Sequence, residues 1–93
     1  MAQNHFWDTA YYNLAVTYIR WGTSLREKAD AAGKDDPEYK NKYKEALPLL
    51  KKAIEIKPED PISWETIAKV YAVLGMSKES QDAFNKADLY RPK

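Results

Sequence analysis

Few residues in this 93-residue chain could do chemistry, and they are not arranged for it. There is no cysteine, so the chain can form no disulfide, no thiolate nucleophile and no sulfur metal site. His5 is the only histidine, and a lone imidazole is too small a ligand set for a transition metal. His5 lies in the expected N-terminal tail, with no evident nucleophile that it could activate as a base. We therefore predict no catalytic residue and no metal site.

The second group with chemical potential lies near the middle of the chain. Asp35, Asp36 and Glu38 could hold a weak cation, but the glycine and distal glutamate of an EF-hand loop are absent. Capping of a helix explains these acids better. Gly33 and Lys34 lack the glycine spacing and the following Ser or Thr of a phosphate-binding loop. We predict no cofactor and do not expect an enzyme.

Composition gives no case for nucleic acid or lipid. The apolar and charged fractions, 44% and 31%, are typical of a soluble folded domain, and the net charge is only +1. Lysines are frequent between residues 40 and 57, but they spread around a predicted helix without an aromatic platform, so a solvated face explains them. No apolar run approaches the ~18 residues of a membrane span. We predict neither nucleic acid nor membrane as partner. The lack of a signal-peptide pattern favours the cytoplasm and leaves the compartment open.

Apolar residues recur at steps of three and four along the chain, which predicts helices and no strands. The expected fold class is all-α. Four helices are predicted, over residues 6–32, 37–57, 61–75 and 77–90. The apolar series of the first helix consists of Tyr11, Leu14, Tyr18, Trp21, Leu25, Ala29 and Ala32.

Local signals mark the helix ends. Asp36-Pro37 and Asp60-Pro61 each offer a carboxylate N-cap followed by proline at the first helical position. Gly75 is expected to end the third helix, and Ser77 to cap the fourth. Pro48 lies inside the second helix, where a missing N–H predicts a kink.

The sequence also repeats itself with a period of about 34 residues, the step that separates Pro58 from Pro92 and Ala53 from Ala87. Helical spacing links the residues of the second copy, which are Trp64, Ile67, Ala68, Tyr71, Gly75, Ser80, Phe84, Ala87 and Pro92. This pattern resembles the tetratricopeptide repeat (TPR). The resemblance implies an α-solenoid in which two antiparallel helix hairpins stack.

The first copy of the repeat contains an insertion. It begins with Tyr11, Leu14, Ala15, Tyr18 and Gly22 at the spacing of the second copy. The next matching residue is Ala46, which lies much further along the chain from Tyr18 than Ser80 lies from the corresponding Tyr71. The additional residues of repeat one therefore lie between Tyr18 and Ala46.

The three-four rhythm of apolar residues continues through the inserted segment, so we expect the insertion to lengthen both helices of the first hairpin. An even split adds roughly 14 Å to each arm. A stretched repeat of this kind is similar to those of some bacterial TPR proteins. We expect one domain over residues 1–93, with repeat one at 8–58 and repeat two at 61–92.

The resemblance implies a binding groove on the concave face, lined by the first helix of each repeat. The groove residues implied in this way are Thr9, Tyr12, Val16, Ile19, Arg20, Ile62, Glu65, Lys69, Ala72 and Val73. Tyr12, Val16 and Ile19 would form an apolar strip there. TPR domains that clamp a C-terminal carboxylate place Lys and Asn at such positions, so that specificity is not expected here. Phe6 and Trp7, or a second copy of the chain, could instead cover the strip.

The end of the repeat array is also visible in the sequence. Leu47 and Ile54 should pack against repeat two, whereas their equivalents one repeat later are Gln81 and Asp88. A polar end face of this kind predicts that repeat two terminates the stack. The function predicted is a non-catalytic protein-interaction module or scaffold that binds a peptide or protein segment in the groove. The alternative is self-association, for example as a homodimer, through the same apolar strip.

Overall fold

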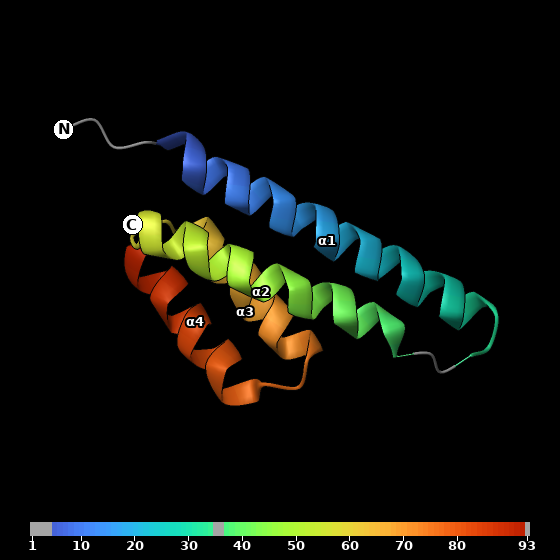
Figure 1. Ribbon diagram of the computed structural model, residues 1–93. Coiled ribbons are helices and arrows are strands. Elements are labelled where there is room, and N and C mark those ends of the chain that lie inside the picture. The colour runs from blue at the N-terminus through green and yellow to red at the C-terminus, as the bar shows by residue number, and fades with distance from the viewer. Residues whose placement is uncertain (1–4, 35–36, 93) are drawn as a thin grey trace.

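The computed structural model describes residues 5–34 and 37–92. All regular secondary structure in these residues is helical, and it forms two antiparallel hairpins (Figure 1). The four helices are α1 (His5–Ala31), α2 (Glu38–Ile56), α3 (Pro61–Val73) and α4 (Ser77–Tyr90). Helix α1 packs along α2, α3 packs along α4, and α2 contacts α3, so that the hairpins stack. The predicted all-α solenoid is confirmed, and the predicted helix bounds agree within two residues. His5 begins α1 instead of lying in a tail.

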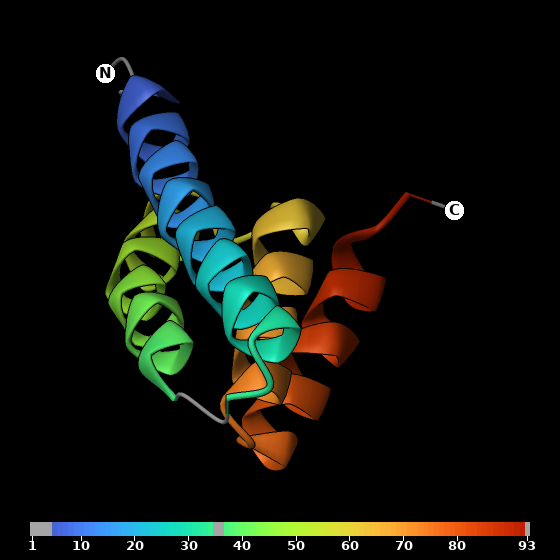
Figure 2. The same cartoon turned by 90° about the vertical axis from the view of Figure 1, so that its right-hand side faces the viewer.

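The first hairpin is longer than the second because the insertion extends both of its helices. In the register of the two repeats, α3 ends at the position that corresponds to Arg20, so residues 21–31 extend α1. Helix α4 begins at the position that corresponds to Tyr43, so residues 38–42 extend α2. Helix α1 thus gains more than α2, and the predicted even split is wrong. The extended ends of α1 and α2 project beyond α3 and α4 (Figure 1). Figure 2 faces these ends and shows α1 beside α2, with α4 on the opposite side of the molecule.

The long hairpin is held together by close packing at a glycine. Gly22 is buried within α1, where an added Cβ would lie 3.0 Å from the carbonyl oxygen of Tyr39 and 3.1 Å from the ring of Tyr43. The Tyr43 hydroxyl lies 2.6 Å from Oγ1 of Thr23. Because the Thr23 hydroxyl donates its own proton to the carbonyl of Ile19 at 2.9 Å, Tyr43 is the donor in this pair. The highly charged stretch that follows Gly33 is thus largely a packed helix and not a linker.

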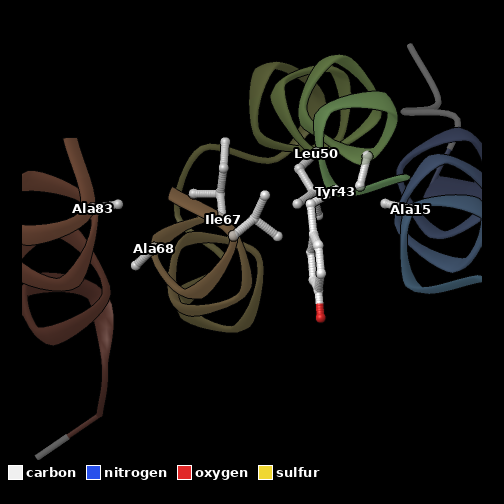
Figure 3. Packing of buried hydrophobic residues seen from close by; sticks show 8 residues of the cluster. Ala15, Tyr43, Leu50, Ile67, Ala68 and Ala83 are labelled. Atoms are coloured by element: carbon white, nitrogen blue, oxygen red, sulfur yellow. The ribbon is translucent and has the colours of Figure 1, made fainter. Parts of the chain in front are cut away.

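The core runs through all four helices and contains many small residues (Figure 3). Leu50, Ile67 and Val70 are its largest fully buried side chains. They are joined by buried alanines at the helix crossings, Ala15, Ala46, Ala53, Ala68, Ala83 and Ala87. Ser80 occupies a similar small position and donates a 2.8 Å hydrogen bond to the carbonyl of Ala68. Small side chains let the helices approach closely, which is how a short chain reaches dense packing.

The apolar series of α1 is unevenly buried. Leu14 and Trp21 are 47% and 50% exposed, and Ala32 is also exposed. The buried residues of α1 are Ala15 and Gly22, which face α2. The series lies at the edge of the contact between α1 and α2. Tyr11 and Leu25 lie beside residues of α2, whereas Leu14 and Trp21 are only half covered.

Both first helices end in the same way. Gly33 and Gly75 have positive φ angles, 68° and 77°, shortly after α1 and α3. The N–H of Lys34 then donates to the carbonyl of Ala29, and that of Met76 to the carbonyl of Tyr71, each at 2.8 Å. This is the Schellman arrangement, which satisfies the last carbonyls of a helix and strongly favours glycine. The prediction for Gly75 is confirmed.

The helix starts follow the predictions less closely. Asp60 caps α3 as expected, because its carboxylate accepts the N–H of Ile62 at 3.1 Å and Pro61 follows at the first helical position. Met76, not Ser77, occupies the N-cap of α4, and no side chain caps that helix. The predicted cap Asp36 lies outside the described residues, and Pro37 occupies the N-cap of α2 instead of the predicted first helical position. Helix α2 continues through the exposed Pro48, where the kink stays a prediction.

Candidate binding groove

Helices α1 and α3 are the first helices of the two hairpins, and a side-chain bond links them. The hydroxyl of Tyr12 on α1 lies 3.0 Å from Oγ1 of Thr66 on α3. Because Thr66 donates its own proton to the carbonyl of Ile62 at 2.8 Å, Tyr12 is the donor. Tyr12 therefore crosses from one hairpin to the other and fixes the spacing of the two helices that carry the predicted groove residues.

The predicted groove residues of α1 differ in exposure. Thr9 and Arg20 are exposed, and Val16 is half-buried. Tyr12 and Ile19 are half-buried and pack against the core. The apolar strip predicted from Tyr12, Val16 and Ile19 is thus less open than expected, because two of its three members also contribute to the packing between helices.

The predicted groove residues of α3 offer more free surface. Ile62 is 58% exposed in the first turn of the helix, where the Asp60 cap and Pro61 fix the backbone. Lys69 and Ala72 are exposed, while Val73 is half-buried against the core. The Asp60 cap and Pro61 fix the start of α3, so the accessible apolar surface of this helix has a defined position.

The charges of the predicted groove are unevenly compensated. Oε2 of Glu65 lies 3.5 Å from Nη2 of Arg91, which follows α4, so this carboxylate has a cationic neighbour. Arg20 and Lys69 have no ion-pair partner among the described residues. The face therefore presents two uncompensated cations beside apolar side chains. Such a surface can bind a ligand, but its described residues do not form the arrangement of acid, base and nucleophile that catalysis would need.

Trp7 does not cover the predicted strip. Its ring pairs with that of Tyr11 at 6.3 Å between centroids. Together they line a hollow with Lys52, Glu55 and Ile56 of α2, whereas Tyr12 reaches Thr66 of α3. This geometry does not support the alternative that Trp7 covers the strip, and the Phe6 side chain lies outside the described residues.

Two other features bear on the kind of site. In the part of the chain that the structure describes, no three His, Cys, Asp or Glu side chains cluster as metal ligands would. Within the same residues, no helix combines the length and apolar character of a membrane span.

One exposed apolar surface was not identified from the sequence, and it lies on the side of α1 that carries Trp7, Leu14 and Trp21. There Trp7, Leu14 and Trp21 are each about half exposed. The signal was present in the repeat register: Leu14 corresponds to Ile67, a residue that packs toward a preceding hairpin, and no helix precedes α1 among the described residues.

The stacked hairpins and their shared repeat register define a helical-repeat module. Comparison with family models narrows the class, because residues 38–60, which include the turn between the hairpins, match the tetratricopeptide repeat model. This match and the stacked helix hairpins are consistent with a TPR-like domain, and repeats of this family are generally protein–protein interaction modules. No curated protein and no solved structure matches the chain significantly.

Proposed function

We propose that this chain is a non-catalytic interaction module that binds a segment of a partner protein along α1 and α3. The observation that carries the proposal is the accessible surface of α3, where Ile62 is 58% exposed and Lys69 and Ala72 are also exposed. An isolated exposed isoleucine needs no explanation, but Ile62 is one of the groove residues that the resemblance to TPR domains implies.

The link between the two helices supports a preformed binding surface. Tyr12 holds α1 to α3 through Thr66, so the two faces keep their spacing when no ligand is present. A preorganised surface loses little conformational entropy when a ligand binds. Val16 and Ile62 would contact apolar side chains of the ligand at the opposite edges of this surface.

The charges of the predicted groove residues restrict the chemical type of the ligand. Arg20 and Lys69 are uncompensated, whereas Glu65 has Arg91 beside it. An acidic group of the ligand would gain charge-assisted hydrogen bonds from both cations. The ligand we propose is therefore an internal peptide segment with Asp or Glu next to a Leu- or Ile-sized side chain.

The test is binding to an array of short peptides that vary in acidic and apolar content, followed by titration of the best peptide. We expect acidic–apolar peptides to be selected, and Arg20→Glu/Lys69→Glu to weaken binding at least tenfold. Lys51→Glu is the matched control, because Lys51 is an exposed lysine on α2 with no ion pair among the described residues. Equal binding by the unmodified chain, the double variant and the Lys51→Glu control would refute the proposal that the peptide binds in the groove.

Light scattering of the unmodified chain tests the alternative. A stable dimer that Val16→Glu dissociates would favour self-association through the predicted strip. A monomer that binds the selected peptides supports the proposal.

A further inference from the structure

Two residues at equivalent positions in the repeats have opposite environments. Leu14 of α1 corresponds to Ile67 of α3 in the repeat register. Ile67 is 2% exposed, because α3 packs on α2 of the preceding hairpin, whereas Leu14 is 47% exposed. The same side of the first helix is therefore covered in repeat two and open in repeat one.

The open side of α1 is a continuous apolar surface, which we name the outer face. Its three most exposed members, Trp7, Leu14 and Trp21, recur at the heptad interval. Tyr11 and Tyr18 lie between them, which produces alternating steps of four and three. The rings of Tyr18 and Trp21 stack, with centroids 6.4 Å apart and planes 7° apart. This spacing is the seam by which one helix packs lengthwise against another.

No charged residue of α1 interrupts the outer face. Between Trp7 and Leu25 the only charged residues are Asp8 and Arg20. At about 100° per residue, Asp8 follows the direction of the buried Ala15, and Arg20 lies on the groove side. Charged residues of α2 lie only at its margin: Nζ of Lys42 sits 3.7 Å from the centroid of the Trp21 ring, and Lys52 and Glu55 line a hollow beside Trp7. An aromatic surface with charges at its rim is typical of an interface.

The outer face and the groove are separate surfaces. Leu14 comes two residues after Tyr12, and Trp21 comes two residues after Ile19. Two residues correspond to about 200° around a helix, so these pairs point in nearly opposite directions. A ligand in the groove would leave the outer face free.

We propose that the outer face of α1 is a second docking surface, and that its occupant is an amphipathic helix of a partner protein that resembles α2. The internal interface defines this helix. Leu47, Leu50 and Ile54 of α2 pack into the core that also contains Ile67. Their spacing is i, i+3 and i+7, one face of a helix. A partner helix with Leu or Ile at the same spacing would bury Leu14 as α2 buries Ile67.

An unmodified second copy does not offer such a helix. The end helix α4 carries Gln81 and Asp88 where α2 has Leu47 and Ile54, and both are exposed. Docking α4 on the outer face would bury an amide and a carboxylate against aromatic rings, which is costly without partners. Head-to-tail stacking through α4 of an identical chain is thus disfavoured.

The expected complex is weak. Two half-exposed tryptophans and a leucine leave roughly 300 Å² of side chain to bury. This is below the roughly 800 Å² per partner of a standard stable interface. We therefore expect a dissociation constant in the micromolar range for the isolated helix pair.

A modified copy of the chain can serve as the probe. In the donor, Gln81→Leu and Asp88→Ile give α4 the apolar spacing of α2, and Leu14→Glu blocks its own outer face. The acceptor is the unmodified chain. We expect light scattering at several hundred micromolar to detect a 1:1 complex and nothing larger. An acceptor with Leu14→Glu should not bind, whereas one with Arg20→Glu, altered only on the groove side, should bind normally.

Each other result overturns the proposal. No 1:1 complex between chains that circular dichroism shows to be folded would remove the α2-like helix as occupant. Dimerisation of the unmodified chain that Leu14→Glu abolishes would assign the outer face to a second copy. Loss of binding by the Arg20→Glu acceptor would place the contact in the groove. If Leu14→Glu unfolds the chain, Trp21→Glu replaces it in both donor and acceptor.

Discussion

Helices α1 and α3 carry the same repeat pattern but make different use of it. Both are first helices, with Tyr18 and Tyr71 at one shared position and Leu14 and Ile67 at another. Tyr18 and Tyr71 are both half-buried against the core. Ile67, in contrast, is buried between the hairpins, while Leu14 is half exposed. What separates the two positions is the presence of a preceding hairpin, not the type of residue.

The comparison shows that burial in a stacked repeat depends on neighbours. Each hairpin packs internally through small residues, such as Ala15 of α1 and Ala68 of α3, which are both fully buried. The larger apolar residues of the stripe are buried only where another hairpin lies beside them. Repeat one is therefore a folded hairpin with one side left open, as nearest-neighbour stacking of repeats allows.

Truncation of the two equivalent residues, Leu14 and Ile67, is the most direct test of their difference in burial. Ile67→Ala should lower the free energy of unfolding by about 2–4 kcal/mol, because it leaves a cavity between the hairpins. Leu14→Ala should cost less than about 1.5 kcal/mol, because half of that side chain is already in water. Urea denaturation followed by circular dichroism measures both values.

Ile67→Val serves as the conservative control and should cost about 0.5–1.5 kcal/mol. Equal losses at positions 14 and 67 in dilute protein would mean that Leu14 is buried in solution. That outcome would contradict an open outer face, and a loss at Leu14 that grows with protein concentration would indicate a self-associated state.

Much of the fold follows from local signals in the sequence. The steps of three and four locate the helices, and the Asp60-Pro61 cap and Gly75 locate the start and end of α3. The repeat register gives the size of the insertion because it compares one repeat with another. These signals depend on neighbouring residues or on internal symmetry, both of which a single sequence contains.

The remainder depends on contacts that the sequence does not specify. A stripe of apolar residues does not reveal whether another helix covers it, so the pattern alone does not distinguish the half-exposed Leu14 and Trp21 from covered residues. The division of the insertion between α1 and α2 and their close approach at Gly22 are likewise properties of the pair of helices. The groove residues follow from family resemblance and stay a prediction, although Tyr12 and Ile19 turn out to serve packing as well.

A second comparison concerns two glycines at the same repeat position. Gly75 ends α3 with a φ of 77°, whereas the equivalent Gly22 lies inside α1 against α2. Gly22→Ala should destabilise the chain by about 1–3 kcal/mol, because the new methyl group meets the backbone oxygen of Tyr39. Gly75→Ala should cost about 1 kcal/mol, because only its backbone conformation is strained.

Amide hydrogen exchange distinguishes the two glycine variants. Gly22→Ala should speed exchange throughout the extended part of the first hairpin, whereas Gly75→Ala should act locally around the turn between α3 and α4. Protection of the long hairpin that is unchanged in a destabilised Gly22→Ala chain would show that the close approach at this glycine is not what holds α1 to α2.

The smallest expected effects come from the two tyrosines that join α1 to its neighbours. Tyr43 of α2 donates to Thr23, and Tyr12 donates to Thr66 of α3, so one bond lies within a hairpin and the other between hairpins. Each Tyr→Phe substitution should cost about 0.5–1.5 kcal/mol, the net value of one hydrogen bond. Double-mutant cycles with Thr23→Val and Thr66→Val isolate the two couplings in denaturant titrations.

The two bonds should also differ in what they control. Tyr12→Phe removes the link that spaces α1 from α3, so it should weaken binding of the acidic–apolar peptide while the long hairpin stays protected from exchange. Tyr43→Phe should loosen that hairpin and leave peptide affinity nearly unchanged. If both variants reduced affinity equally, the spacing of α1 and α3 would depend on the whole stack, and the groove could not be assigned to the Tyr12 bridge.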